Sequence, residues 1–238
     1  IELNHEVEVN GLARVHFRGS GWTDLKFANG RMIYVDPPPP RAIGRGQSVN
    51  IVGENVKIIN NNGSYLTPLD KEYVLASANI NIHALLLSFV EELNDVIETI
   101  ALIKDYTPSP LVGLKIESAK GLAFAQNYFS SGSRAFGVFP MLARDDLTNE
   151  LGGGLAVTQA TEIMIGLSPK PVAASRFFSE LLLTGEAGPA DFSDWHLLHQ
   201  LGYQDFLLQD ELCLKPDYFE KVMQAIGDYQ NEYLKPGD

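Results

Sequence analysis

The spacing of apolar residues changes near residue 80, and this change constrains the fold more than any other feature. Before it, short runs with alternating apolar residues are separated by glycine-containing pairs such as Asn29-Gly30. Beyond it, apolar residues recur every three or four positions, as on one face of a helix. We therefore expect an α/β protein of two domains, a β-rich N-terminal module over residues 1–78 and an α/β domain with a helical C-terminal part over residues 79–238.

The first domain is predicted to be an antiparallel β meander. Three hairpins are expected, each made of two short runs around a glycine: Glu6–Val9 with Leu12–Phe17, Leu25–Ala28 with Arg31–Val35, and Val49–Val52 with Val56–Ile59. The tetraproline Pro37–Pro40 predicts a rigid, extended connector between strand pairs, or else a ligand for a proline-recognising partner. Three aromatic residues of this domain indicate either a binding face or its core, namely Trp22, Tyr34 and Tyr65.

The second domain is predicted to combine helices with a buried strand. A long amphipathic helix is expected over residues 82–100, and the apolar run Leu111–Ile116 predicts a strand buried on both faces. Four later helices are expected, at Leu155–Ile165, Val172–Leu183, Ala190–Leu201 and Tyr218–Tyr233. A helix that leads into a buried strand is typical of α/β proteins.

Charge and composition restrict the partners. A formal net charge of -12 disfavours nucleic acid and anionic membrane surfaces, so small molecules and proteins are the expected partners. No apolar run approaches the roughly 20 residues that span a bilayer, and residues 1–6 lack the pattern of a signal peptide. The single cysteine, Cys213, excludes an internal disulfide. We expect a cytoplasmic protein, and we expect from the first residue, Ile1, that the chain was processed or trimmed.

Two backbone loops are candidates for holding a negative charge. The triplet Gly152–Gly154 opens an apolar, helix-competent segment, so its N–H groups are candidate donors. A second candidate donor loop, Ser118–Ala125, follows the strand-like run upstream. Together they suggest an oxyanion hole, and the alternative is that the glycine triplet is only a flexible loop between helices.

Several motifs resemble, in the same order, segments of the crotonase (enoyl-CoA hydratase/isomerase) superfamily. They cover roughly residues 80–210 and are Asn81–Ile97, Val112–Phe124, Leu151–Val157, Thr161–Pro169 and Leu181–Tyr203. The resemblance implies a crotonase-like α/β core after the meander, with the N–H groups of Ala125 and Gly153 directed at a thioester carbonyl. It also implies an acyl group on coenzyme A or a carrier as substrate, no separate cofactor, and a homo-oligomer such as a trimer.

Departures from the family pattern narrow the expected reaction. The glutamate that hydratases carry just after the glycine triplet is replaced here by Ala156. Since hydration uses two carboxylates, an isomerase, decarboxylase or hydrolase is expected in place of a hydratase. Glu162 lies among apolar residues and is the candidate general acid or base, or else an ordinary solvent-facing helix glutamate. The expected catalytic residues are therefore Ala125, Gly153 and Glu162.

No metal site is predicted. His196 and His199 share one helix face, but no third ligand with clear spacing accompanies them, so a polar helix face is preferred. Asp145-Asp146 with Glu150 could attract a cation, and a solvated acidic loop is the preferred interpretation.

A second functional hypothesis stays open beside the acyl-thioester enzyme. The missing glutamate and the unmatched N-terminal third also fit a non-catalytic binding or assembly protein, whose meander presents a surface to a partner. The sequence alone leaves it undecided whether the chain is an enzyme.

Overall fold

A computed structural model describes residues 1–17, 21–44, 49–53, 55–59, 64–78, 80, 82, 84–104, 111–131, 135, 137–167 and 169–233. The chain divides into two compact units, Ile1–Lys71 and Glu72–Asp238, and the division falls inside helix α1 (Pro68–Ala78). The expected domain boundary after residue 78 stays a prediction. None of the described helices is both long and apolar enough to cross a membrane.

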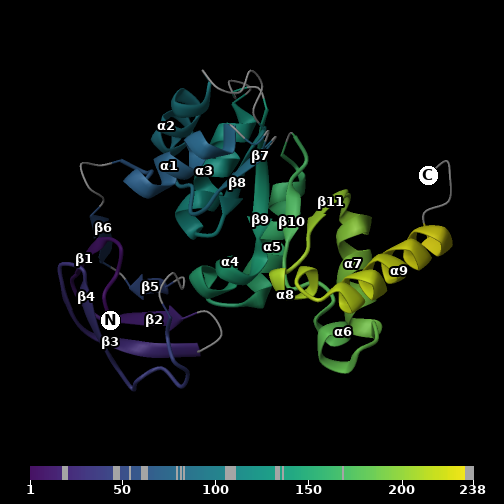
Figure 1. Ribbon diagram of the computed structural model, residues 1–238, viewed down its shortest axis with the longest axis horizontal. Helices are drawn as coiled ribbons and strands as arrows, with labels where there is room; N and C mark the ends of the chain where they lie inside the picture. Colours follow the sequence, from purple (N-terminus) through teal and green to yellow (C-terminus); the bar gives the residue numbers. More distant parts are fainter. Residues whose placement is uncertain are drawn as a thin grey trace. The chain divides into compact units, whose positions relative to one another are not determined.

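The first unit is built from antiparallel strands (Figure 1). Four of them form a sheet in the order β4-β3-β2-β5, and the other two pair with each other. Their bounds are β1 (Glu6–Val9), β2 (Ala13–Phe17), β3 (Gly21–Asn29), β4 (Met32–Asp36), β5 (Val49–Gly53) and β6 (Val56–Ile59). Alternate residues of these strands point inward, and Val7, Val15, Phe17 and Ile33 form the buried core.

One of the three expected hairpins is confirmed and two are wrong. Strands β3 and β4 pair around Asn29-Gly30 as expected, but β1 pairs with β6 and β2 pairs with β5. The backbone N–H of Asn10 donates to the carbonyl of Asn55 at 3.0 Å, which links the β2–β5 ladder to the β1–β6 ladder. Gly11, with a φ of 115°, therefore lets the chain bend within a continuing ladder instead of reversing it.

The second unit contains a five-stranded sheet in which all neighbours are parallel. Its strands stand in the order β11-β10-β9-β8-β7, so each lies beside the next strand of the chain, as in an α/β barrel. Their bounds are β7 (Ala84–Leu87), β8 (Leu111–Ile116), β9 (Val138–Ala143), β10 (Val172–Ala174) and β11 (Asp205–Leu207). The expected buried strand at Leu111–Ile116 is confirmed as β8.

Helices follow these strands along the chain (Figure 1). Their bounds are α2 (Leu93–Ile103), α3 (Ala119–Ser130), α4 (Arg144–Leu151), α5 (Gly154–Ile165), α6 (Ser179–Thr184), α7 (Pro189–Leu201), α8 (Asp210–Cys213) and α9 (Pro216–Tyr233). The helices expected near α5, α7 and α9 are confirmed.

The strand register separates a helix-covered face of the sheet from the opposite face. Val112, Leu114 and Ile116 of β8 are buried on the covered face. On the same face, Phe206 of β11 stacks on Trp195 of α7 with ring centroids 4.1 Å apart. Alternation therefore places Lys115 and its neighbours in register on the opposite face.

Two helices expected from the sequence are wrong in part, because each apolar run begins with a strand. Ala84–Leu87 is strand β7, and helix α2 begins only at Leu93, where the Asp95 carboxylate accepts the backbone N–H groups of Glu91 and Glu92. A short apolar run fits a strand and a buried helix equally well by periodicity, and pairing with β8 decides between them.

The second wrong helix was expected over Val172–Leu183. Its first residues form β10, and the helical part begins at Ser179, after Phe178 takes a left-handed φ of 58°. Pairing of β10 with β9 and β11 provides hydrogen-bond partners for the backbone of Val172–Ala174, so this segment forms a strand and not a helix.

Candidate functional site

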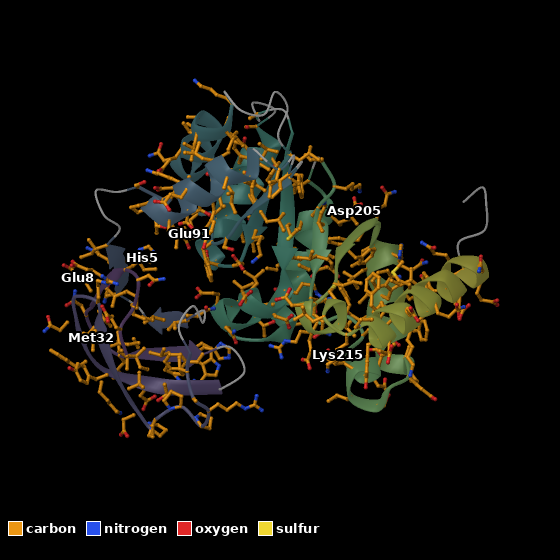
Figure 2. The ribbon with its side chains drawn as sticks, viewed as in Figure 1. His5, Glu8, Met32, Glu91, Asp205 and Lys215 are labelled. Atoms are coloured by element: carbon orange, nitrogen blue, oxygen red, sulfur yellow. The ribbon has the colours of Figure 1, made fainter. Side chains whose placement is uncertain are left out.

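Charged residues gather where the parallel strands end. Glu117 follows β8 directly, Arg144–Asp146 follow β9, and Arg176 lies two residues beyond β10. Glu91, labelled in Figure 2, lies in the connection after β7. Because all five strands are parallel, their carboxyl ends share one edge of the sheet, and such edges bind ligands in α/β enzymes.

A buried ion pair lies at the end of β8. The Lys115 Nζ is 2.7 Å from Glu117 Oε1, and the Glu117 side chain is only 3% exposed while that of Lys115 is 23% exposed. The other oxygen, Glu117 Oε2, accepts the backbone N–H of Phe89 at 2.6 Å. Burial raises the pKa of the Glu117 carboxyl above its ordinary value, and the Lys115 charge acts in the opposite direction.

Two aspartates at the end of β9 continue this charged edge. The negative charge of Asp146 acts on Glu117 and adds to the rise of the Glu117 pKa. Asp145 accepts the backbone N–H of Arg176 and lies 3.5 Å from its Nε. Burial raises the pKa of Asp145, and the charge of Arg176 opposes that rise. Glu117 and Asp146 are thus like charges held near each other by two neighbouring strands.

The residue before these aspartates ties the edge to a helix. Both terminal nitrogens of Arg144 lie 2.8 Å from the carboxylate oxygens of Asp194 on α7. Such a two-bond pair fixes orientation as well as distance. The Nε of Arg144 is buried and has no hydrogen-bond partner in the part of the chain that the structure describes. We infer that Arg144 mainly holds α7 against the end of β9.

Further carboxylates extend the edge toward β7. Glu91 accepts the Ser118 hydroxyl at 2.5 Å and lies 3.2 Å from Lys120 Nζ. Burial raises the pKa of Glu150 on α4, and the charge of Glu91 raises it further. Among the described residues, however, no group of three or more His, Cys, Asp or Glu side chains is arranged to hold a metal ion by itself.

This arrangement suits an anionic substrate that arrives with a divalent cation. Mg²⁺ is usually bound by one or two carboxylates, together with waters and substrate phosphates. Glu117 and Asp146 match that number and type of protein ligand. Lys115 and Arg176 bring positive charge to the same edge of the sheet. The Arg176 side chain is 67% exposed and is therefore accessible to a ligand.

The residues expected to form an oxyanion hole have other roles. Gly152 and Gly153, with φ values of 78° and 148°, make the turn between α4 and α5, and the Gly153 N–H donates to the Thr148 carbonyl at 3.1 Å. Ala125 is buried in the interior of α3, past the first turn, where N–H groups bond within the helix. Glu162 is exposed on α5. Neither N–H group is free to bind an oxyanion.

Both histidines singled out in the sequence contact α9. His196 Nδ1 lies 2.8 Å from Tyr229 Oη, and the His199 ring stacks on Tyr229 with centroids 5.4 Å apart. Burial lowers the pKa of His199. In the first unit, Trp22 is half-buried beside His16, and Tyr34 is exposed beside Phe27.

Sequence reasoning missed Lys115, Glu117 and Arg176, and set Asp145-Asp146 aside as a solvated loop. The signal was present, because each of these residues stands at or just after the end of a short apolar run. Successive apolar runs that end in charged residues are typical of parallel strands with a ligand site at their carboxyl ends. The pattern was missed because the runs that form β7 and β10 were interpreted as parts of helices.

The sequential order and parallel pairing of the five strands are those of an α/β-barrel type of sheet. A similar solved structure is the crystal structure of pyruvate kinase from Cryptosporidium parvum, with a TM-score of 0.71 and 20% sequence identity. The likeness covers 92% of this chain and 46% of that chain, so this chain spans about half the length of the enzyme it matches. No model of a known protein family matches, and no curated protein does.

The comparison corrects the expected function. An acyl-thioester enzyme of crotonase type, with acyl-CoA as substrate, is wrong, because the structural likeness is to pyruvate kinase and the two expected N–H donors are occupied. The general expectation of an α/β protein preceded by antiparallel strands is confirmed. The expected homo-oligomer stays a prediction.

Proposed function

We propose that the Glu72–Asp238 unit carries the substrate-binding edge of a phosphotransferase of the pyruvate kinase type. The observation that carries this proposal is the buried Lys115–Glu117 pair at the end of β8, with the charge of Asp146 acting on it. The fold likeness supports phosphoryl transfer over other reactions of anionic substrates.

Phosphoryl transfer depends mainly on positioning and on neutralising charge, which this edge can supply. Glu117 and Asp146 would hold a divalent cation, which when bound neutralises phosphate oxygens. Lys115 would place its ammonium group against the oxygen on which negative charge increases during transfer. Arg176, next to Asp145, would bind a further phosphate oxygen.

The cation site is tested by Mn²⁺ binding, followed by electron paramagnetic resonance. Glu117→Gln and Asp146→Asn are each expected to weaken binding by about tenfold or more, since each removes one of two anionic ligands. Glu162→Gln is the matched control, because Glu162 is exposed on α5. The Mn²⁺ affinity of this variant is expected to stay within about twofold of that of the unchanged protein. Unchanged affinity in both site variants would contradict the proposed site.

The reaction is tested with Mg²⁺, pyruvate and ATP labelled in its γ-phosphoryl group. Pyruvate loses a methyl proton to solvent, its enolate oxygen bonds to the γ-phosphorus, and the bond from that phosphorus to ADP breaks, so that ADP leaves and the label appears in the enol phosphate. Lys115→Met is expected to lower the rate by about two orders of magnitude, because it removes a charge directed at the developing negative charge. Lys120→Met is the control, since Lys120 pairs with Glu91 and not with Glu117. Equal rates in the two variants would exclude Lys115 from the reaction.

A further inference from the structure

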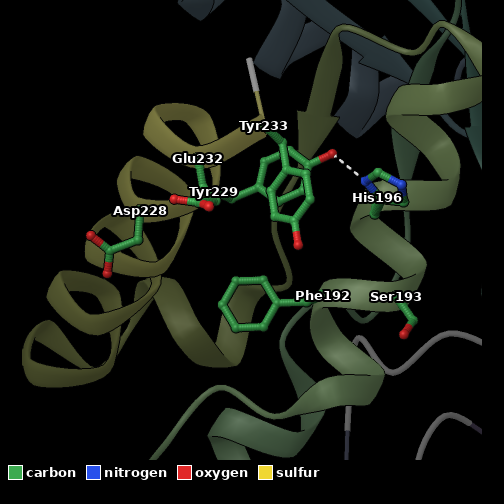
Figure 3. A pocket seen from close by; sticks show the side chains of 7 residues that line it. All are labelled: Phe192, Ser193, His196, Asp228, Tyr229, Glu232 and Tyr233. Atoms are coloured by element: carbon green, nitrogen blue, oxygen red, sulfur yellow. Dashed lines mark hydrogen bonds between the residues drawn. The ribbon is translucent and has the colours of Figure 1, made fainter. Parts of the chain in front are cut away.

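A cavity lies between helices α7 and α9, and its lining residues are distinct from those of the charged edge of the sheet. Its volume is about 560 Å³, within the range of small-molecule sites. Phe192 and His196 of α7 line one side, and Tyr229 and Tyr233 of α9 line the other (Figure 3). Nothing in the proposed phosphotransferase site uses these residues.

The aromatic walls of this cavity are fixed by contacts among themselves. The rings of Tyr229 and Tyr233 stack with centroids 5.1 Å apart, and the ring centroid of His196 lies 5.4 Å from that of Tyr233. The hydrogen bond of 2.8 Å between His196 Nδ1 and Tyr229 Oη, drawn in Figure 3, joins the two helices. A ligand therefore meets rings that are already in place, which lowers the entropic cost of binding.

The charge on the cavity is negative. Asp228 and Glu232, one helical turn apart on α9, both line it, and Asp228 also accepts a hydrogen bond of 2.8 Å from Gln224. Among the described residues that line the cavity, none is a lysine or an arginine. Aromatic ring faces also carry negative charge density, so rings and carboxylates attract the same kind of ligand.

We propose that this cavity binds a small organic cation of the alkylammonium class. An alkylammonium ion offers apolar surface to Phe192 and Tyr233 and charge to Glu232, whereas a hydrated metal ion would leave the rings without a partner. The same helix already shows this chemistry at its start, where the Nζ atoms of Lys215 and Lys221 lie 5.3 and 5.9 Å from the ring centroid of Tyr218.

Choline is the probe for this proposal, and 3,3-dimethylbutan-1-ol is its neutral counterpart of the same shape. Calorimetric titration of the full chain is expected to show saturable choline binding, with the neutral alcohol bound about tenfold more weakly because it lacks the charge. Tyr233→Leu is expected to weaken choline binding by about fivefold or more. Tyr233 is 60% exposed, so this change should leave the fold intact.

Glu232→Gln separates charge from shape. It is expected to weaken choline binding by about threefold or more while leaving the neutral alcohol unaffected. Glu220→Gln changes an exposed residue elsewhere on α9 and is the control. It should alter neither the affinity for choline nor the affinity for the neutral alcohol. The proposal is overturned by equal affinity for the two probes, by no saturable choline binding, or by full binding in Tyr233→Leu. Mn²⁺ affinity is expected to be unaltered in these variants, which separates this cavity from the proposed cation site.

Discussion

Glu117 is nearly inaccessible to solvent, and two groups stabilise its negative charge. One is the backbone N–H of Phe89 and the other is the ammonium group of Lys115. Burial dominates over both, so the pKa of Glu117 is raised. A cation that binds the carboxylate must therefore compete with a proton at a higher pH than for an exposed glutamate.

Removing Lys115 should move this competition to higher pH. Cation binding is lost as the pH falls through the raised pKa of Glu117, and Lys115 holds that pKa down. In Lys115→Met the pKa rises further, so the midpoint at which Mn²⁺ affinity is lost should shift upward. Titration of Mn²⁺ binding between about pH 4 and pH 8 measures the midpoint. Lys120→Met should leave it in place, and an unshifted midpoint in Lys115→Met would contradict the assigned role.

Asp191 has a structural role, because it is buried and accepts three backbone N–H groups. The donors are Glu180 at 3.0 Å, Leu181 at 2.9 Å and Gly188 at 3.4 Å. Asp191→Ala leaves these donors without their acceptor and should lower the free energy of unfolding by about 3 kcal/mol. Urea denaturation measures the change. The exposed control Glu220→Ala should stay within about 0.5 kcal/mol, and a similarly small loss for Asp191→Ala would refute this role.

Helix α3 packs closely on the connection after β7. A Cβ added at Gly121 would lie 2.7 Å from the backbone carbonyl oxygen of Val90, an atom that cannot move aside as a side-chain end can. Ser118, the residue just before the helix, caps it: its hydroxyl oxygen accepts the Gly121 N–H, and its hydroxyl group also donates to Glu91. The start of α3 therefore helps to position one carboxylate of the charged edge.

Two helix glycines should respond in opposite ways to alanine. Gly121→Ala should lower the free energy of unfolding by about 1 to 3 kcal/mol, because the new methyl group meets backbone. Gly227→Ala on α9 meets open space and should raise it by about 0.5 to 1 kcal/mol, because alanine is the better helix former. Thermal denaturation of the two variants gives both signs, and stabilisation by Gly121→Ala would show that the contact is looser than described.

Local patterns predicted the elements that depend on local residues. The β3–β4 hairpin follows from Asn29-Gly30, and the helix expected over Ala190–Leu201 is α7, which begins one residue earlier at Pro189. The patterns failed at β7 and β10, where three or four apolar residues fit strand and helix alike. Only the neighbouring strands, which accept their backbone hydrogen bonds, make these segments strands.

Each of the two units has buried apolar residues of its own, so damage to one should spare the other. Ile33 of the first unit and Leu114 of the second are both fully buried. Either change to alanine should cost about 2 to 5 kcal/mol in its own unit. Ile33→Ala should keep Mn²⁺ affinity within about twofold, whereas Leu114→Ala, on the strand that carries Lys115, should lower it. Binding measured alongside denaturation tests this, and loss of affinity in Ile33→Ala would contradict independence of the units.

The sequence by itself determined the α/β fold class and several of the secondary-structure elements. Alternating and helical periodicity are properties of neighbouring residues, so the antiparallel N-terminal region, β8, α5, α7 and α9 could be predicted from them. Tertiary structure alone decided the pairing of β1 with β6 and of β2 with β5, and the site itself. Glu117 and Asp146 lie far apart along the chain and act on each other only because β8 and β9 are parallel neighbours. Within the glycine triplet, Gly152 and Gly153 take positive φ angles that serve a turn between two helices, and both of their N–H groups donate to the Thr148 carbonyl.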